Sequence, residues 1–329
     1  MTAFLARRIL SVVPTLVGIS LLTFLILNLI PSDPLLTWSS AGTAPSADEL
    51  DHLREELRAD RGPVARYLDW VVAVMSGDLG RSLRDGRPVT GVIAESLPWT
   101  LLLNLTAVLL IYGVAIPFGF LGASSPGSAA DRVGGWVLLA LYALPSFAAA
   151  LVLQEVLSVR LHLLPLQGVG DPGISASVVA RAIDLLRHLA LPAACLALSG
   201  WAFVARYARA VFRSALGSEH LVMARAKGLS RLRASLHVLA SSAVPLVTLL
   251  AAILPGLVGG SVIIEQVFSW PGLGRLYLGS VLARDYPVVL GLTLLSASAV
   301  LAGQLVVDVL YLVVDPRTRT GLLPERARA

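Results

Sequence analysis

The chain has 329 residues, of which 56% are hydrophobic and only 14% are charged, and its mean hydropathy is +0.78. Because soluble domains carry about 25% charged residues, this composition excludes an ordinary soluble globule. The net charge of +5 could suit nucleic acid, but the arginines and lysines gather beside the ends of apolar runs, where membrane orientation and anionic lipid explain them.

Several apolar runs are long enough to cross a bilayer, which takes about 20 residues in a helix. We expect an all-α membrane protein with six spans, at about 9–30, 98–122, 133–159, 188–211, 243–264 and 288–314. Pro117 and Pro145 lie inside the second and third runs and predict kinks there. The first run follows Arg7 and Arg8, is too long for a signal-peptide core and lacks a small-residue cleavage site, so we expect it to remain as a span.

The segment between the first two spans, residues 31–97, is polar and rich in acids and arginines. We expect it to form an extracytoplasmic insertion with structure of its own. Ser46 and the leucines after it predict an amphipathic helix over 46–58. The apolar stripe from Tyr67 to Val74 suits the membrane interface. The run Gly77-Asp78-Leu79-Gly80 predicts a turn, since the ligand spacing of a calcium loop is missing.

Positive charge marks one side of the membrane. Arg7 and Arg8, the end of the fourth span, the loop after it and the C-terminal tail fall on the same side if six spans alternate. Under the positive-inside rule this side is the cytoplasm, so both termini are expected there. The predicted organisation is 1–30, N-terminal segment and first span; 31–97, extracytoplasmic region; 98–314, transmembrane core with a cytoplasmic loop at 213–240; and 315–329, cytoplasmic tail.

The loop at 213–240 predicts a short helix, a turn and a second short helix. Glu219 can open the first helix as a cap or first-turn acid, and Gly228 can end it because glycine takes a left-handed conformation. Ser230 can then cap the second helix. A helix pair with a stripe of small residues suits docking into a groove on a soluble partner. The alternative is a cationic loop that only fixes the topology.

No enzyme constellation is recognisable in the sequence. The five histidines are scattered, Cys195 is the single cysteine, and there is no P-loop, so we expect neither ATP hydrolysis nor a bound metal or cofactor in this chain. Asp308 is the only acid well inside a predicted span, where a charge costs about 2.5–3.5 kcal/mol. It is either a pathway or gating residue or the partner in an interhelical hydrogen bond. Glu155 can reach the interface, and Asn104 suits helix packing.

The cytoplasmic loop carries a family signature. The run Ala224-Arg225-Ala226-Lys227-Gly228-Leu229, followed by Pro245, resembles the "EAA" loop of ABC importer permeases in the form used by the dipeptide, oligopeptide and nickel branch. Ala224 and Gly228 match the Ala and Gly of the motif, whereas Val222 stands where its Glu is expected. The resemblance implies that Glu219 and residues 224–229 form the coupling helix that contacts the ATPase subunit.

A second set of motifs lies nearer the C-terminus. The runs Ile264-Glu265-Gln266-Val267-Phe268-Ser269-Trp270-Pro271-Gly272-Leu273-Gly274-Arg275, Arg284-Asp285-Tyr286-Pro287 and Val307-Asp308-Val309-Leu310-Tyr311 look like the first permease of dipeptide and nickel importers. The resemblance implies that the outer loops with Trp270, Pro271, Gly272 and Asp285 face the opening of the path and hold gating candidates. By pattern alone, Trp270-Pro271-Gly272 could also be a tight turn with an interfacial Trp anchor.

These resemblances imply a type I ABC importer permease fold and a subunit that forms half of the path for di- or oligopeptides, in the bacterial cytoplasmic (inner) membrane. The implied partners are a second homologous permease, two ATPase subunits that bind ATP and Mg, and an extracytoplasmic solute-binding protein, with no nucleic acid. Nickel or a metal chelate is the alternative substrate, although no His or Cys cluster favours free metal. The alternative of another class is a non-transporting membrane scaffold or sensor.

Overall fold

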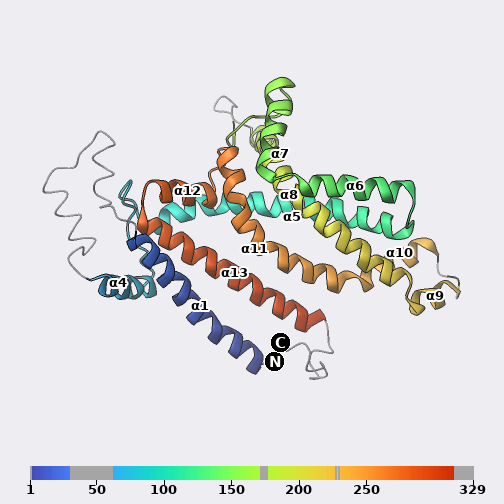
Figure 1. The fold of residues 1–329 in the computed structure, drawn as a ribbon, viewed down its shortest axis with the longest axis horizontal. Coiled ribbons are helices and arrows are strands. Elements are labelled where there is room, and N and C mark those ends of the chain that lie inside the picture. Colours follow the sequence, from blue (N-terminus) through green and yellow to red (C-terminus); the bar gives the residue numbers. More distant parts are fainter. Residues whose placement is uncertain (1, 30–61, 171–176, 227, 229, 315–329) are drawn as a thin grey trace. The chain divides into compact units, whose positions relative to one another are not determined.

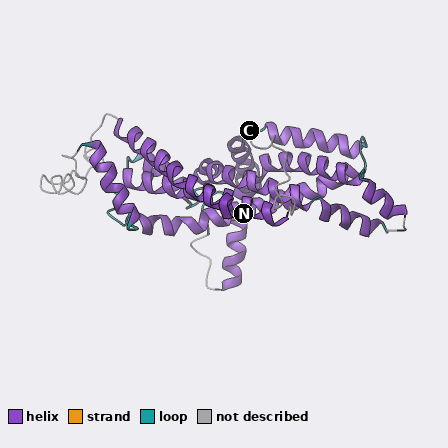
Figure 2. Cartoon of the chain, turned by 90° about the horizontal axis from the view of Figure 1, so that it is seen from below, coloured by secondary structure: helices purple, strands orange, loops and turns teal. Residues whose placement is uncertain are grey.

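The computed structural model describes residues 2–29, 62–170, 177–226, 228 and 230–314 (Figure 1). Every element assigned within these residues is a helix, and the one sheet-like contact among them is an isolated bridge between Arg81 and Pro88 (Figure 2). The all-α class is therefore confirmed for the described part of the chain. The helix expected over 46–58 and the tail from 315 lie outside it. The chain divides into two compact units, Met1–Pro98 with Gly272–Leu301, and Trp99–Pro271 with Ala302–Ala329.

The first unit contains α1 (Thr2–Leu29), α4 (Pro63–Met75), the start of α5 (Val89–Ser124), α12 (Leu273–Leu282) and the start of α13 (Tyr286–Val314). Pro63 opens α4, where its fixed φ and missing N–H cost nothing. Tyr67 on α4 is buried against Phe24 and Leu290, and its hydroxyl lies 2.9 Å from Ser20 Oγ on α1. The stripe that begins at Tyr67 therefore packs on protein at this residue, and its expected place at the membrane interface stays a prediction.

The turn expected after α4 is present. Gly77 and Gly80 both have a φ of +84°, which is a conformation that residues with a Cβ rarely adopt. The carboxylate of Asp78 accepts a hydrogen bond from the Gly80 N–H at 2.8 Å, as in an Asx turn. The turn leads into α5, whose first residue, Val89, is fully buried with Val288 of α13.

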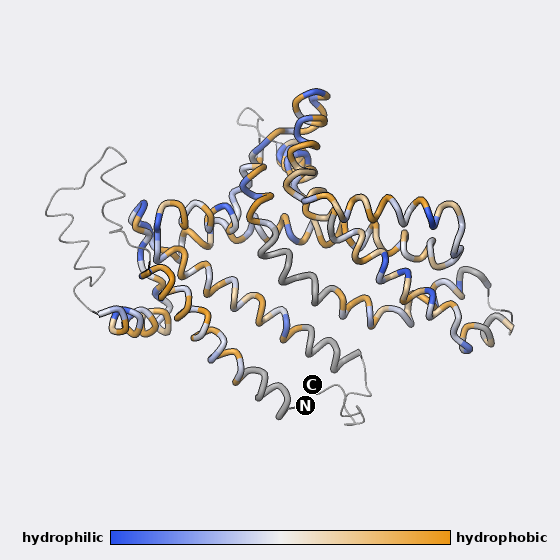
Figure 3. Tube along the Cα trace, viewed as in Figure 1, coloured by the Kyte–Doolittle hydropathy of each residue, from blue (hydrophilic) through white to orange (hydrophobic). Residues whose placement is uncertain are grey.

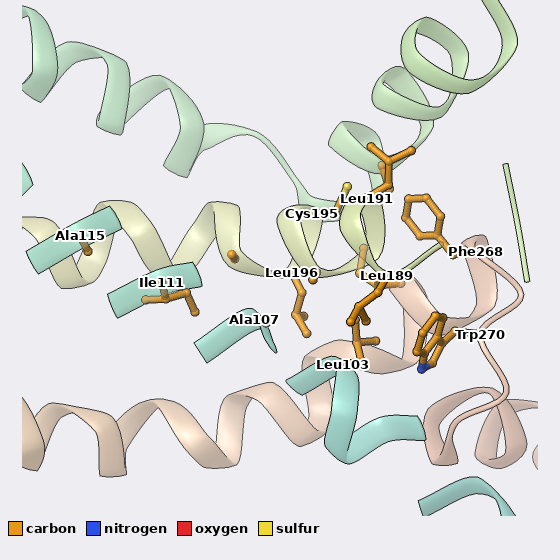
Figure 4. Packing of buried hydrophobic residues seen from close by; sticks show 14 of the residues in the cluster. Leu103, Ala107, Ile111, Ala115, Leu189, Leu191, Cys195, Leu196, Phe268 and Trp270 are labelled. Carbon is orange, nitrogen blue, oxygen red and sulfur yellow. The ribbon is translucent and has the colours of Figure 1, made fainter. Parts of the chain in front are cut away.

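The second unit is built around α8 (Val178–Leu216), which packs against α6 (Ala129–Ala143), α7 (Ser146–Leu153), α10 (Arg231–Ser241) and α11 (Ala243–Val267). A short π-helix, η1 (Gln154–Arg160), extends α7, and α9 (Glu219–Ala226) precedes α10. The largest buried cluster joins Leu103 and Ile111 of α5 to Leu189 and Leu196 of α8, with Trp270 at one end (Figure 4). Burial of this apolar surface against α8 holds the unit together.

The predicted spans agree with the helices in place, but several boundaries differ. Helix α5 starts at Val89, nine residues before the expected start at 98, and continues unbroken past Pro117. At Pro145 the chain turns more sharply than a kink, because α6 and the α7–η1 segment meet at 98°. Leu144 has a ψ of 121° there, since the ring of a following proline disfavours the helical region. The outer loop after η1 is shorter than expected, because α8 begins at Val178, ten residues before the predicted start of the fourth span at 188.

Three helices with described side chains are long and apolar enough to cross a membrane: Leu10–Leu29, Val89–Ser124 and Tyr286–Val306. The number is five if each of two bent pairs counts as one span, namely α6 with α7–η1 and the two parts of α8, which meet at 54°. Helix α11 is not included in this count, because the side chains of residues 250–260 lie outside the described part of the chain. Hydrophobic residues dominate most of the helical length in Figure 3. Large apolar side chains such as Leu105 and Leu109 are more than 60% exposed, as expected of a surface that faces lipid.

Candidate functional site

The helix pair α9–α10 forms as its local sequence predicts. Glu219 lies in the first turn of α9, where a negative charge complements the positive end of the helix dipole. Gly228 follows α9 with a φ of +85° and turns the chain. The hydroxyl of Ser230 caps α10 by accepting a hydrogen bond from the Arg233 N–H at 3.5 Å. The predicted helix, turn and helix are thus present at these residues.

A small hydrophobic cluster fixes this helix pair to the longer helices. Leu221 of α9 is 1% exposed and packs with Phe212 of α8, Val238 of α10 and Leu246 of α11. Phe212 in turn meets the ring of Phe120 on α5 edge-on, with the ring centroids 5.5 Å apart. Close-packed side chains therefore connect α9 to the ends of α5, α8 and α11.

The other face of α9 is open. Glu219, Ala226 and Gly228 are exposed, and the apolar side chain of Met223 is 57% exposed. The side chains of Ala224, Arg225, Lys227 and Leu229, also predicted to couple, lie outside the described residues. A single exposed apolar side chain is normal on a protein surface, so the docking of this face to a partner stays a prediction.

Asp285 belongs to a buried polar tie in the first unit. Its carboxylate is 2% exposed and accepts hydrogen bonds from the Ser82 hydroxyl at 2.5 Å, the Leu83 N–H at 3.0 Å and the Arg84 N–H at 3.4 Å. A buried carboxylate requires such donors, since burial without them is costly. Asp285 therefore holds the hairpin at residues 78–88 onto the junction of α12 and α13.

The same hairpin carries an exposed charged cluster. Arg87 donates to Asp85 and to Glu95, each at 2.9 Å. Partial burial acts to raise the pKa of Asp85, but hydrogen bonds from Arg87 and Ser82 outweigh it and hold that pKa below its ordinary value. These pairs lie at the surface, where their contribution to stability is small.

Trp270 lies in the interior of the second unit. Its side chain is fully buried, and its indole N–H donates to the Trp99 carbonyl at 2.9 Å. The two indole rings meet edge-on, with centroids 5.7 Å apart. The turn itself is tight, with Ser269 at a φ of +51°, but the interpretation of Trp270 as an interfacial anchor is wrong. Pro271 and Gly272 follow, and Gly272 is the N-cap of α12.

Glu265 was not singled out by the sequence analysis. It was expected in an outer loop, but it lies inside α11 with its side chain fully buried. Its carboxylate accepts a hydrogen bond from the Thr100 hydroxyl of α5 at 2.9 Å. The partners are 165 residues apart, so only the fold brings them together. The available signal was the unbroken helical pattern from 243, which extends to Val267.

The other polar residues have separate outcomes. The side chain of Asp308 lies outside the described residues, so its two interpretations remain predictions. Glu155 is exposed and pairs with Arg160 at 2.9 Å. Asn104 is 9% exposed, as packing requires, but its carbonyl oxygen accepts no hydrogen bond from any described residue.

Apolar helices of spanning length, in both units of the described part of the chain, define a multi-pass helical membrane protein. Residues 115–320 match the family described as the inner membrane component of binding-protein-dependent transport systems. Residues 1–104 match the N-terminal family of the membrane component of such systems. The chain therefore belongs to the family of inner membrane components of binding-protein-dependent transport systems.

Several relatives are similar over nearly their whole length. The oligopeptide transport system permease protein AppB of Bacillus subtilis is 36% identical over 321 residues, which cover 96% of this chain and 99% of the relative. The dipeptide transport system permease protein DppB of Escherichia coli K12 is 35% identical over 338 residues, covering 97% and 99%. A putative peptide permease of Brucella ovis is 34% identical, with coverage of 97% and 99%.

Proposed function

We propose that this chain is a permease subunit of an ABC importer and forms half of the transmembrane path for di- or oligopeptides. The observation that supports it most is the match to oligopeptide and dipeptide permeases at 35–36% identity over 99% of their length. The names of these relatives favour peptides over the alternative of nickel or a metal chelate. Substrate choice would rest mainly with the solute-binding protein that delivers the peptide.

The proposed topology has six spans. Helix α11 is apolar along 243–264 by sequence, and adding it to the five candidates in the described residues gives six. An even number places both termini on one side, and the arginines beside α8 and in the tail assign that side to the cytoplasm. Residues 31–97 would then form the extracytoplasmic insertion.

The proposed partners are a second homologous permease, two ATPase subunits that hold ATP and Mg, and the solute-binding protein. Closure of the ATPases would push on α9, and the cluster around Leu221 would pass this displacement to α5, α8 and α11. The bend at Pro145 separates α6 from α7, and a second bend divides α8, so these segments can tilt separately. Alternating opening of the two mouths follows from such tilting.

The test is substrate-stimulated ATP hydrolysis by the complex reconstituted in liposomes. Reversing the charges with Arg225→Glu and Lys227→Glu should abolish the stimulation and leave membrane insertion intact, because only the docked surface changes. Arg181→Glu, at the exposed opposite end of α8, is the matched control and should retain it. Undiminished stimulation in the double variant would contradict the proposal. Purification without any ATPase subunit would favour the scaffold alternative.

A further inference from the structure

A cavity of about 490 Å³ lies in the second unit among α5, α6 and α8. No described residue of α9 or α10 lines it, so it is distinct from the proposed coupling surface. Its wall is divided by chemistry. Phe118, Leu121 and Leu138 form an apolar part. The polar part is formed by Arg206 and Arg209 in the C-terminal half of α8, and by Ser125, Ser128 and Asp131 between α5 and α6 and in the first turn of α6.

The polar part has a positive charge in excess. Arg209 pairs with Asp131 at 2.6 Å, and its Nε is buried without a hydrogen-bond partner among the described residues. Arg206 stacks over the ring of Tyr142, 5.3 Å from its centroid, and no carboxylate in the described part of the chain pairs with it. Arg213, one turn further on, is exposed. Among the described residues, one carboxylate, that of Asp131, thus lines the cavity with two guanidinium groups, and Arg213 adds a third positive charge near Asp131.

The apolar part is open to the surroundings. Of the side chains that line it, Leu121 and Phe118 of α5 are 66% and 40% exposed, and on α6 Val133 and Trp136, which lie outside the lining, are 62% and 72% exposed. In a membrane-spanning unit, side chains of this kind meet lipid tails. The cavity therefore has two parts. One is an apolar surface of the kind that acyl chains cover, and the other is a cationic end held in a fixed geometry.

We propose that this cavity binds one anionic phospholipid. Arg206 and Arg209 donate to its phosphate, for which guanidinium groups supply several aligned donors. An acyl chain fills the apolar wall between α5 and α6. Charge complementarity selects an anionic headgroup over a zwitterionic one, as basic pockets between transmembrane helices do. The lipid lies in the inner leaflet if the orientation under the proposed function holds.

Substitutions at Arg206 and at Gly135 test the cationic part and the apolar part of this site separately. Arg206→Gln removes one charge and leaves the Arg209–Asp131 pair in place. Gly135 lines the cavity, and a Cβ built there meets no atom within 4 Å, so Gly135→Leu places a side chain in the cavity without a clash at Cβ. Gly113 of α5 also has an open Cβ position but does not line the cavity, which makes Gly113→Leu the matched control.

The test is native mass spectrometry of the full chain titrated with phosphatidylglycerol, with phosphatidylcholine of the same acyl chains, and with inorganic phosphate. We expect phosphatidylglycerol to bind more tightly than phosphatidylcholine, and Arg206→Gln to weaken it about five-fold, since one arginine near a lipid surface contributes on the order of 1 kcal/mol. Gly135→Leu should weaken both lipids, whereas Arg181→Gln and Gly113→Leu should weaken neither.

Four outcomes overturn the proposal. The first is equal affinity for the two lipids, and the second is phosphatidylglycerol binding that neither Arg206→Gln nor Gly135→Leu changes. The third comes from native membranes: a photoreactive residue at position 135 that captures a second permease subunit instead of lipid shows that protein covers the cavity. Binding of inorganic phosphate as tight as that of the lipid likewise removes the role of the acyl chain. Lipid binding can be measured without partner subunits, so its failure is separable from failure of the proposed function.

Discussion

Replacement of Gly228 tests whether backbone conformation governs the α9–α10 turn. The residue has a φ of +85°, and a Cβ built there meets no atom within 4 Å. Any penalty on substitution in the free chain must therefore come from the left-handed conformation and not from a clash. For a residue with a Cβ this penalty is roughly 1–2 kcal/mol. It corresponds to a factor of about 5–30 in the population of the turn.

The order of variants follows from this cause. Asn tolerates the left-handed region, so Gly228→Asn should be mild although its side chain is larger than that of alanine. Gly228→Ala should carry the full penalty, and the β-branched Gly228→Val should be worst. Gly217, at the end of α8, has a φ of −87°, so Gly217→Ala is the control and should change little.

The assay is the apparent affinity of stripped membranes containing the permease pair for added ATPase subunit, with stimulation of ATP hydrolysis as a second readout. Affinity falls in proportion to the fraction of turns in the competent conformation. We expect a loss of up to about 5–30-fold for Gly228→Ala if the turn is only marginally stable in the free loop. A loss that instead grows with side-chain volume, with Asn worse than Ala, would refute the backbone argument and indicate a tight groove on the partner.

Two further predictions concern the buried polar ties. Asp285→Ala leaves the Ser82 hydroxyl and the Leu83 N–H without their acceptor and should lower the free energy of unfolding by about 1–3 kcal/mol. We expect faster proteolysis of the hairpin at residues 78–88 in sealed, right-side-out vesicles. Unchanged cleavage would contradict this prediction. Trp270→Ala should cost about 3–5 kcal/mol because the ring is fully buried. Trp270→Phe should cost less, since it mainly removes the hydrogen bond to Trp99; thermal denaturation of the purified chain measures both, and equal losses would contradict the order.

The local features of the candidate site were predictable because their causes are local. A left-handed glycine at 228, a capping serine at 230 and a first-turn acid at 219 each act within a few residues. The same holds for the turn at Gly77 and Gly80. The helical spans were predictable in position because apolar length is what a bilayer selects.

The features that were missed depend on residues far apart in sequence. Asp285 finds its donors about 200 residues away, and Trp270 its carbonyl 171 residues away. Because Trp270 precedes a proline and a glycine, its local sequence suggests a turn at the membrane–water interface, where tryptophan is common. The break at Pro145 was predicted, but its 98° angle was not. A proline disfavours the helical conformation of the residue before it, whereas the direction of the next helix depends on tertiary packing.

The proposed coupling requires that the helices next to α9 do not slide past one another, and α5 and α8 are packed closely enough to resist such sliding. A Cβ added to Gly119 of α5 would lie 2.8 Å from the Ala208 Cβ and 2.9 Å from the Ala205 carbonyl oxygen of α8. These two helices therefore touch almost backbone to backbone, with no flexible side chain between them. The contact lies in the half of α8 that also carries Phe212, which packs against Leu221. Under the proposed function, displacement of α9 would then carry α5 and α8 together, so the helix pair would act on a rigid pair of helices and not on a single one.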